Sequence, residues 1–128
     1  MAKGHRSQIK KERNQNKDTR PSAKLSYARM SAQKAGFVLD AIRGKDVQTA
    51  LGILAYNPRY ASAVIEKLLK SAIANAENNN GMNPETLYVE ECFANKATTM
   101  KRIRPRARGM AYRIEKRMCH ITVVLNER

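Results

Sequence analysis

Acidic residues are scarce in this chain of 128 residues, which carries 11 Asp and Glu against 25 Lys and Arg and has a formal charge of +14. An excess of one sign on this scale indicates a polyanionic partner. Tryptophan is absent, and five Tyr and two Phe supply all the aromatic side chains. Hydrophobic residues nevertheless make up 42% of the chain, enough for the core of one domain, so we do not expect a disordered protein.

Long hydrophobic runs are also missing, and cysteine is rare. No run of about 18 apolar residues occurs, so we expect no membrane span. Residues 1–14 lack the apolar stretch of a secretory signal, so we expect a cytoplasmic protein. Cys92 and Cys119 are too few for a disulfide scaffold, and their spacing does not fit a zinc site. We expect both to be reduced core residues, and we expect no metal or other cofactor.

The positive charge is concentrated at the two ends of the chain. Residues 1–30 carry nine basic and two acidic side chains, residues 31–95 carry six and seven, and residues 96–128 carry ten and two. A compact, near-neutral body with two cationic attachments is therefore predicted. The first attachment, residues 1–23, is the N-terminal extension. It has almost no aliphatic residues, so we expect it to order only against phosphates.

Residues 24–128 are predicted to form a single α+β domain with three amphipathic helices. Ser31 suits the N-cap of the first, residues 32–43, and Asp46 caps a second that ends near Tyr56. Asn57 and Pro58 suit the N-cap and first residue of the third, which the Asn-rich run at residues 78–81 ends.

Alternating apolar residues predict strands in the remainder of the body. Residues 24–30 would place Leu25, Tyr27 and Arg29 on one face. A strand from Thr86 would place Leu87, Val89 and Phe93 on one face, and a last strand follows Cys119 with Ile121, Val123 and Leu125 turned inward.

Residues 94–118 join the last two strands and are predicted to form a long β-hairpin, here called the arm. Its only turn formers are Pro105 and Gly109, which place the turn near residues 104–109. At ~3.3 Å per residue, one side of the arm reaches ~30 Å. The radius of gyration of the body should be only ~11 Å. The arm must therefore protrude.

The tip of the arm is rich in arginine. Arg102, Arg104, Arg106 and Arg108 occupy every second position, so an extended backbone would place them on one face. Arginine grips phosphate oxygens with two hydrogen bonds and also stacks on bases. A two-stranded arm with crowded like charges is only marginally stable alone, so we expect the partner to neutralise it and the free tip to be mobile.

Folded RNA with crevices is the better match for such an arm, and a DNA-bending architectural protein with a proline-tipped β-arm is the alternative. A cationic membrane-surface segment is disfavoured because the basic segments lack a large apolar face. An RNA-modifying enzyme would need a cofactor loop or a catalytic pair, and the sequence contains neither.

The sequence therefore predicts that the protein is not an enzyme and has no small-molecule substrate. Glu90 and Glu91 are adjacent in a predicted strand and should point to opposite faces. His5 lies in the N-terminal extension and His120 in a predicted strand, and neither belongs to a catalytic motif with a partnered Ser or Cys. Asn75 and the run at residues 78–80 could bond bases, although helix termination explains the run equally well.

Four sequence blocks resemble a known family. They are ARMSAQK at residues 28–34 leading into IRGK at 42–45, SAIANAEN at 71–78, MKRI with PRA and Gly109 at 100–109, and KR with HITVV at 116–124. In this order and spacing, the chain over residues 25–128 resembles the bacterial type of the twenty-second family of large-subunit ribosomal proteins.

The resemblance implies three helices packed on a three-stranded antiparallel sheet, two of whose strands extend into the arm. It implies a structural constituent of the large subunit that binds rRNA, supports assembly and lines the nascent-peptide exit tunnel. Its partners would be rRNA, neighbouring ribosomal proteins and, at the tip of the arm, the nascent peptide.

The resemblance also implies which residues contact rRNA: Arg29, Ser31, Gln33, Lys34, Arg43 and Lys45 around the first helix, and Lys101, Arg102, Arg106, Arg113, Lys116 and Arg117 on the arm. The charge pattern adds Arg104 and Arg108. The tip is expected to face the tunnel lumen with Arg104, Pro105, Arg106, Ala107, Arg108 and Gly109.

Overall fold

The structure is a computed structural model that describes residues 6–15 and 18–128. In chain order its elements are α1 (Arg6–Gln15), β1 (Ser22–Ala28), α2 (Ala32–Ile42), α3 (Val47–Tyr56), α4 (Tyr60–Asn80), β2 (Leu87–Lys96), β3 (Met100–Pro105), the 3₁₀ turn η1 (Ala107–Gly109), β4 (Ala111–Lys116) and β5 (Cys119–Glu127). The α+β class is confirmed. The described residues contain one α-helix more than expected, because α1 lies within the N-terminal extension.

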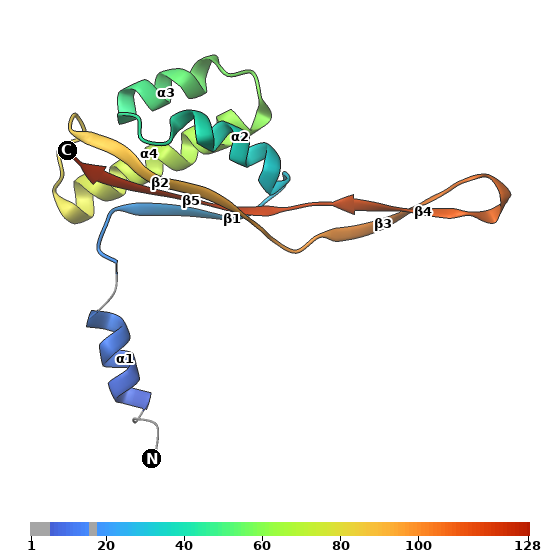
Figure 1. Ribbon diagram of the computed structural model, residues 1–128, viewed down its shortest axis with the longest axis horizontal. Coiled ribbons are helices and arrows are strands. Elements are labelled where there is room, and N and C mark those ends of the chain that lie inside the picture. Colours follow the sequence, from blue (N-terminus) through green and yellow to red (C-terminus); the bar gives the residue numbers. More distant parts are fainter. Residues whose placement is uncertain (1–5, 16–17) are drawn as a thin grey trace.

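The body is a three-stranded antiparallel sheet of order β1-β5-β2, with α2, α3 and α4 on one of its faces (Figure 1). The core lies between the two layers. The predicted inward positions of the central strand β5 are confirmed, since Cys119, Ile121, Val123 and Leu125 are all fully buried. The core face of α2 consists of Ala35, Val38, Leu39 and Ile42, which are all buried.

The helix boundaries follow local capping chemistry. The Ser31 hydroxyl accepts a hydrogen bond from the Lys34 amide at 3.3 Å, which confirms the N-cap of α2. The expected start of α4 was wrong by two residues. Asn57 forms a turn by accepting a bond from the Arg59 amide, and the helix begins at Tyr60. Gly81 ends α4 in the left-handed conformation, which glycine adopts without strain.

Two β-bulges shift the face on which residues of the edge strands lie. In β1 the pairing with β5 is interrupted between Leu25 and Ala28, and Tyr27 has a positive φ of 57°. The prediction that Leu25, Tyr27 and Arg29 share one face is therefore wrong, because an extra residue breaks the alternation. Tyr27 is exposed, and its ring meets His120 edge-on with centroids 4.6 Å apart.

A bulge in β2 makes two further predictions wrong, one on the alternation along this strand and one on the faces of Glu90 and Glu91. Val89 pairs with Leu125 and Glu91 with Val124, so Glu90 is the additional residue. Beyond it Cys92 is buried and Phe93 is exposed, the reverse of the expected alternation. Glu90 and Glu91 were expected on opposite faces, but both form ion pairs with Arg20, at 2.9 and 3.0 Å.

Beyond the body, the chain of β2 leads into β3, and β4 leads back into β5. β3 and β4 form a separate two-stranded sheet, paired from Met100↔Lys116 to Pro105↔Ala111 and closed by η1. Figure 1 shows this ribbon projecting well beyond the helices. The protruding arm and the position of its turn are confirmed.

The N-terminal extension is more ordered than expected. α1 is a helix without a single buried residue, so its local propensity rather than packing accounts for it. Lys, Arg, Gln and Glu, which make up most of it, are good helix formers. Figure 1 shows α1 standing apart from the body. Residues 1–5 and 16–17, including His5, lie outside the described residues.

Arg20 fastens the end of the extension to the body. Its guanidinium contacts Asp18 at 2.7 Å as well as the two glutamates of the β2 bulge. The Arg20 hydrogen bonds hold the pKa of the Asp18 carboxyl at about 2, below its usual 3.8. Asn80 and Asn75 donate to the carbonyls of Thr19 and Ser22 at 2.9 and 3.0 Å. Both side-chain amides therefore bond the chain near the start of β1.

Replacing Arg20 with Gln should return the pKa of Asp18 toward 3.8. A carboxyl with a lowered folded-state pKa adds stability above its unfolded pKa, and this contribution disappears as the pH falls from about 4 to about 2. The variant should therefore lose part of the acid sensitivity of unfolding in that window. The measurement is an NMR titration of Asp18 together with urea unfolding at several pH values. Asp18→Asn is the matched control, and an unchanged Asp18 titration in the Arg20 variant would contradict the assignment.

Candidate nucleic-acid interface

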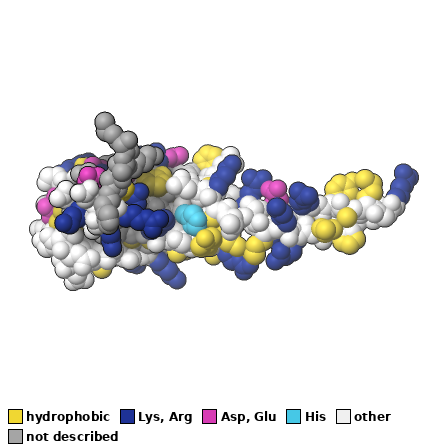
Figure 2. Space-filling model, turned by 90° about the horizontal axis from the view of Figure 1, so that it is seen from below, with side chains coloured by type: hydrophobic (Ala, Val, Ile, Leu, Met, Phe, Trp, Pro, Cys, Tyr) yellow, Lys and Arg dark blue, Asp and Glu magenta, His cyan; other side chains and the backbone are white. Residues whose placement is uncertain are grey.

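The register of the arm places cations on both of its faces. Directly opposed residues of an antiparallel pair share a face, so Arg102 and Arg104 lie with Tyr112, Ile114 and Lys116. Lys101 and Arg113 lie on the other face, with Ile103 and Glu115. The arm therefore presents positive charge on both of its faces. Figure 2 shows Lys and Arg side chains along the length of the arm.

The predicted alternation of arginines ends at the turn. Arg102 and Arg104 lie in β3, and the backbone of Arg106 is still extended at φ −128° and ψ 178°. Arg108, however, adopts the left-handed conformation at φ 59° and ψ 33°, so it does not continue the row and this part of the prediction was wrong. The Arg106 guanidinium lies 5.8 Å from the centroid of the Tyr112 ring, a cation–π contact that links the tip to β4.

The cations of the arm are almost entirely without acidic partners. Residues 94–118 contain nine Lys and Arg and one acidic residue, Glu115. Among the described residues, the only ion pair within the arm joins Arg117 to Glu115 at 3.0 Å. Two arginines of the body, in contrast, are paired with carboxylates: Arg43 with Asp40 at 2.8 Å and Arg128 with Asp46 at 3.1 Å. The unneutralised charge of the protein is thus concentrated on the arm.

A crevice of about 1080 Å³ lies where the arm meets the starts of α2 and α4. It brings together predicted residues from both sequence regions, namely Arg29, Ser31 and Lys34 with Arg102, Lys116 and Arg117. Met30, Met100 and Met118 also line it. Residues about 70 positions apart in sequence therefore form one basic surface, here called the basal crevice.

Three further lining residues were not predicted: Phe37 on α2, Arg59, and Tyr60 at the first turn of α4. The Arg59 guanidinium lies 5.9 Å from the centroid of the Phe37 ring. Phe37 breaks the apolar period of α2, since it falls between core positions but is exposed. The position of this large aromatic residue off the apolar face was the signal in the sequence that could have identified Phe37. Nothing in the sequence indicated that Arg59 lies beside Phe37.

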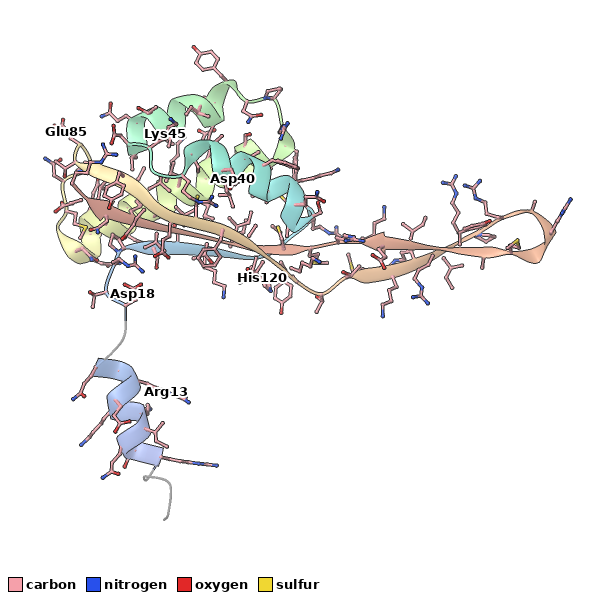
Figure 3. All side chains as sticks on the ribbon, viewed as in Figure 1. Arg13, Asp18, Asp40, Lys45, Glu85 and His120 are labelled. Atoms are coloured by element: carbon pink, nitrogen blue, oxygen red, sulfur yellow. The ribbon has the colours of Figure 1, made fainter. Side chains whose placement is uncertain are left out.

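Other predicted residues lie elsewhere. Gln33 is exposed on α2, outside the residues that line the crevice. Arg43 and Lys45 lie at the opposite end of α2, where Arg43 also donates to the Cys92 carbonyl at 2.9 Å. Arg43 therefore has a structural role in joining α2 to β2. Figure 3 shows Lys45 and Asp40 on the helical side of the body, away from the arm.

The two cysteine thiols of the core are not suited to act as reactive groups. Burial raises the pKa of both the Cys92 and the Cys119 thiol, which keeps them protonated and unreactive. The His120 Nδ1 accepts a hydrogen bond from the Tyr27 amide at 3.0 Å. In the part of the chain that the structure describes, there is no group of three or more His, Cys, Asp or Glu side chains that could hold a metal ion. No described helix is long and apolar enough to cross a membrane.

Comparison with known proteins adds independent findings. Residues 23–126 match the family described as "Ribosomal protein L22p/L17e". The chain is 80% identical to the "Large ribosomal subunit protein uL22" of Lachnoclostridium phytofermentans and 78% identical to that of Lachnospira eligens, over the full length of both chains in each case. It is 72% identical to the protein of the same name from Agathobacter rectalis, again over the whole of each chain.

Proposed function

Because this chain belongs to the L22p/L17e family of ribosomal proteins, we propose that it binds rRNA of the large ribosomal subunit through its arm and basal crevice. Family membership makes it a structural constituent of the ribosome in the cytoplasm, and not an enzyme. Its partners are rRNA and neighbouring ribosomal proteins. The family match decides against the alternative of a DNA-bending protein.

The concentration of unpaired cations on the arm carries this proposal. Nine Lys and Arg face one acidic residue, and two strands without a core of their own cannot bury any of that charge. Phosphates supply the missing counter-charge, and binding releases the cations condensed on the RNA. Phosphate contacts then fix the position of the arm without reading sequence.

We assign the contacts to residues of the arm, the crevice and the N-terminal extension. On the arm they are Lys101, Arg102, Arg104, Arg106, Arg108, Arg113, Lys116 and Arg117, and around α2 they are Arg29, Ser31, Gln33, Lys34, Arg43 and Lys45. The exposed α1 adds Arg6, Lys10 and Arg13, which recur at helical spacing on one side of that helix. Figure 3 shows Arg13 on α1 at a distance from the sheet.

Replacing Arg102, Arg106 and Arg113 with Ala should weaken rRNA binding and leave the body folded, because all three side chains are exposed. Each lost phosphate contact lowers the slope of log K against log salt by about 0.7–0.9, so the triple variant should lose about 2–3 from the slope. The measurement is a filter-binding titration with large-subunit rRNA fragments at several salt concentrations.

A charge-matched control comes from the body. Lys24, Lys67 and Lys70 are exposed on β1 and α4, outside the proposed interface, and replacing them with Ala removes the same charge. This control should retain most of the salt slope. Equal slopes for the two triple variants would mean that net charge rather than the arm drives binding.

A second part of the proposal concerns the tip of the arm. Residues 104–109 are all exposed and lie at the end of the arm away from the body. We propose that they border the lumen of the exit tunnel and contact the nascent peptide, while the rest of the arm lies against rRNA. Pro105 supports this role because it lacks a backbone donor and stiffens the chain before the turn.

Deleting residues 104–109 leaves residues 110–112 as a three-residue loop between the paired Ile103 and Arg113. The variant should change the tunnel bore without abolishing assembly, because the crevice and the base of the arm remain. The measurement is a structure of ribosomes that carry the variant, together with their yield in sedimentation. A wild-type particle in which Pro105 is enclosed by RNA, far from any nascent chain, would contradict the lumen assignment.

A further inference from the structure

We propose that the basal crevice binds an unpaired nucleotide of RNA, whose base stacks on the aromatic wall formed by Phe37 and Tyr60 while its phosphates contact the surrounding cations. This inference deepens the proposed rRNA binding and rests on it. It assigns to the crevice a contact with a base, in addition to the phosphate contacts proposed for the arm.

The exposure of the two rings is the first observation. Phe37 is 59% exposed and Tyr60 is 70% exposed, although both come from helices whose other faces pack into the core. Both line the same crevice. Large aromatic side chains are usually buried, and here both rings line one basic concavity. Ring surface is therefore available for a second planar group.

Arg59 is the second observation. Its guanidinium lies over the Phe37 ring at 5.9 Å, which holds a planar cation at the aromatic wall. Among the described residues no carboxylate forms an ion pair with it. Such a group can stack on a base or bind a phosphate with two hydrogen bonds.

The charge and size of the crevice complete the site. Its lining includes six Lys and Arg and one acidic residue, Glu115, which already pairs with Arg117. Pockets that enclose small organic ligands measure about 300–1,000 Å³, and the crevice measures about 1080 Å³. It can therefore accept a nucleotide with its flanking phosphates.

An unpaired nucleotide fits this site better than duplex RNA or an acidic protein segment. Bases within a duplex are stacked on one another, so an aromatic wall cannot reach their faces. An acidic peptide would engage the cations and leave the rings without a planar partner. The crevice is also continuous with the base of the arm, through Arg102 and Lys116, so the same RNA can run from one to the other.

The two phenylalanines provide an internal control. Phe37 lines the crevice, whereas Phe93 is 41% exposed on β2 and does not line it. In protein labelled with fluorophenylalanine, single-stranded oligoadenylate of about eight nucleotides should shift the Phe37 fluorine resonance and leave Phe93 in place. A blunt-ended RNA duplex, compared at equal phosphate concentration, should shift neither, because its bases are stacked on one another. Phe93→Leu assigns the two resonances.

Affinity measurements with the same probes test the energetic role. Phe37→Leu and Tyr60→Leu should each weaken single-strand binding about tenfold, since stacking on one aromatic contributes that order of affinity. The salt slope should stay unchanged because no charge is lost. Tyr56→Leu is the matched control: Tyr56 is 92% exposed at the end of α3, outside the crevice, and its loss should have no effect.

The outcomes separate this inference from the proposed function. Suppose that RNA binding still depends on the arm arginines, but the Phe37 fluorine resonance does not shift and Phe37→Leu binds with normal affinity. The base-stacking site is then wrong, while the proposed rRNA binding stands. A larger Phe37 shift with polyglutamate than with oligoadenylate would also overturn it, in favour of an acidic protein segment. Failure of any RNA to bind would reject both.

Discussion

The repulsion among unpaired cations on a two-stranded arm is the constraint on which the rest of the molecule depends. Two strands alone bury too little surface to be independently stable, and residues 94–118, which form this arm, carry nine Lys and Arg and one acidic residue. The body compensates for this at the base, where the chain of β2 and β5 continues directly into β3 and β4. A free arm is held in position only from that end, and the phosphates of the proposed rRNA partner would neutralise it along its length.

The body is built as an anchor for the arm. β5 is the central strand of the sheet, with its inward side chains fully buried, so the strand that enters the body from the arm is also the best protected. Acidic residues are used locally: Asp40, Asp46 and the Glu90–Glu91 pair each hold an arginine that joins two elements. These carboxylates therefore form ion pairs within the body, and the arm keeps its positive charge.

The basal crevice arises where these two parts meet. β1 ends at Ala28, just beyond its bulge, and the capped start of α2 follows at Ser31. Because α4 starts late, Arg59 is its N-cap and Tyr60 its first residue, and both line the same crevice as that turn. Two exposed aromatic side chains and two groups of cations thus line a single concave surface at the base of the arm, and this surface is the base-stacking site that we propose.

The sequence by itself determined the class of the fold, the three body helices, the inward face of β5, the protruding arm and the segregation of charge, because periodicity, capping and net charge are local properties of the chain. It did not determine the faces of β1 and β2, since one extra residue in a strand reverses every side chain beyond it and is visible only in the pairing with β5. The helix α1 was missed because it buries nothing. Arg20 with Glu91, and Arg59 with Phe37, are separated by long stretches of chain, and only tertiary packing brings them into contact.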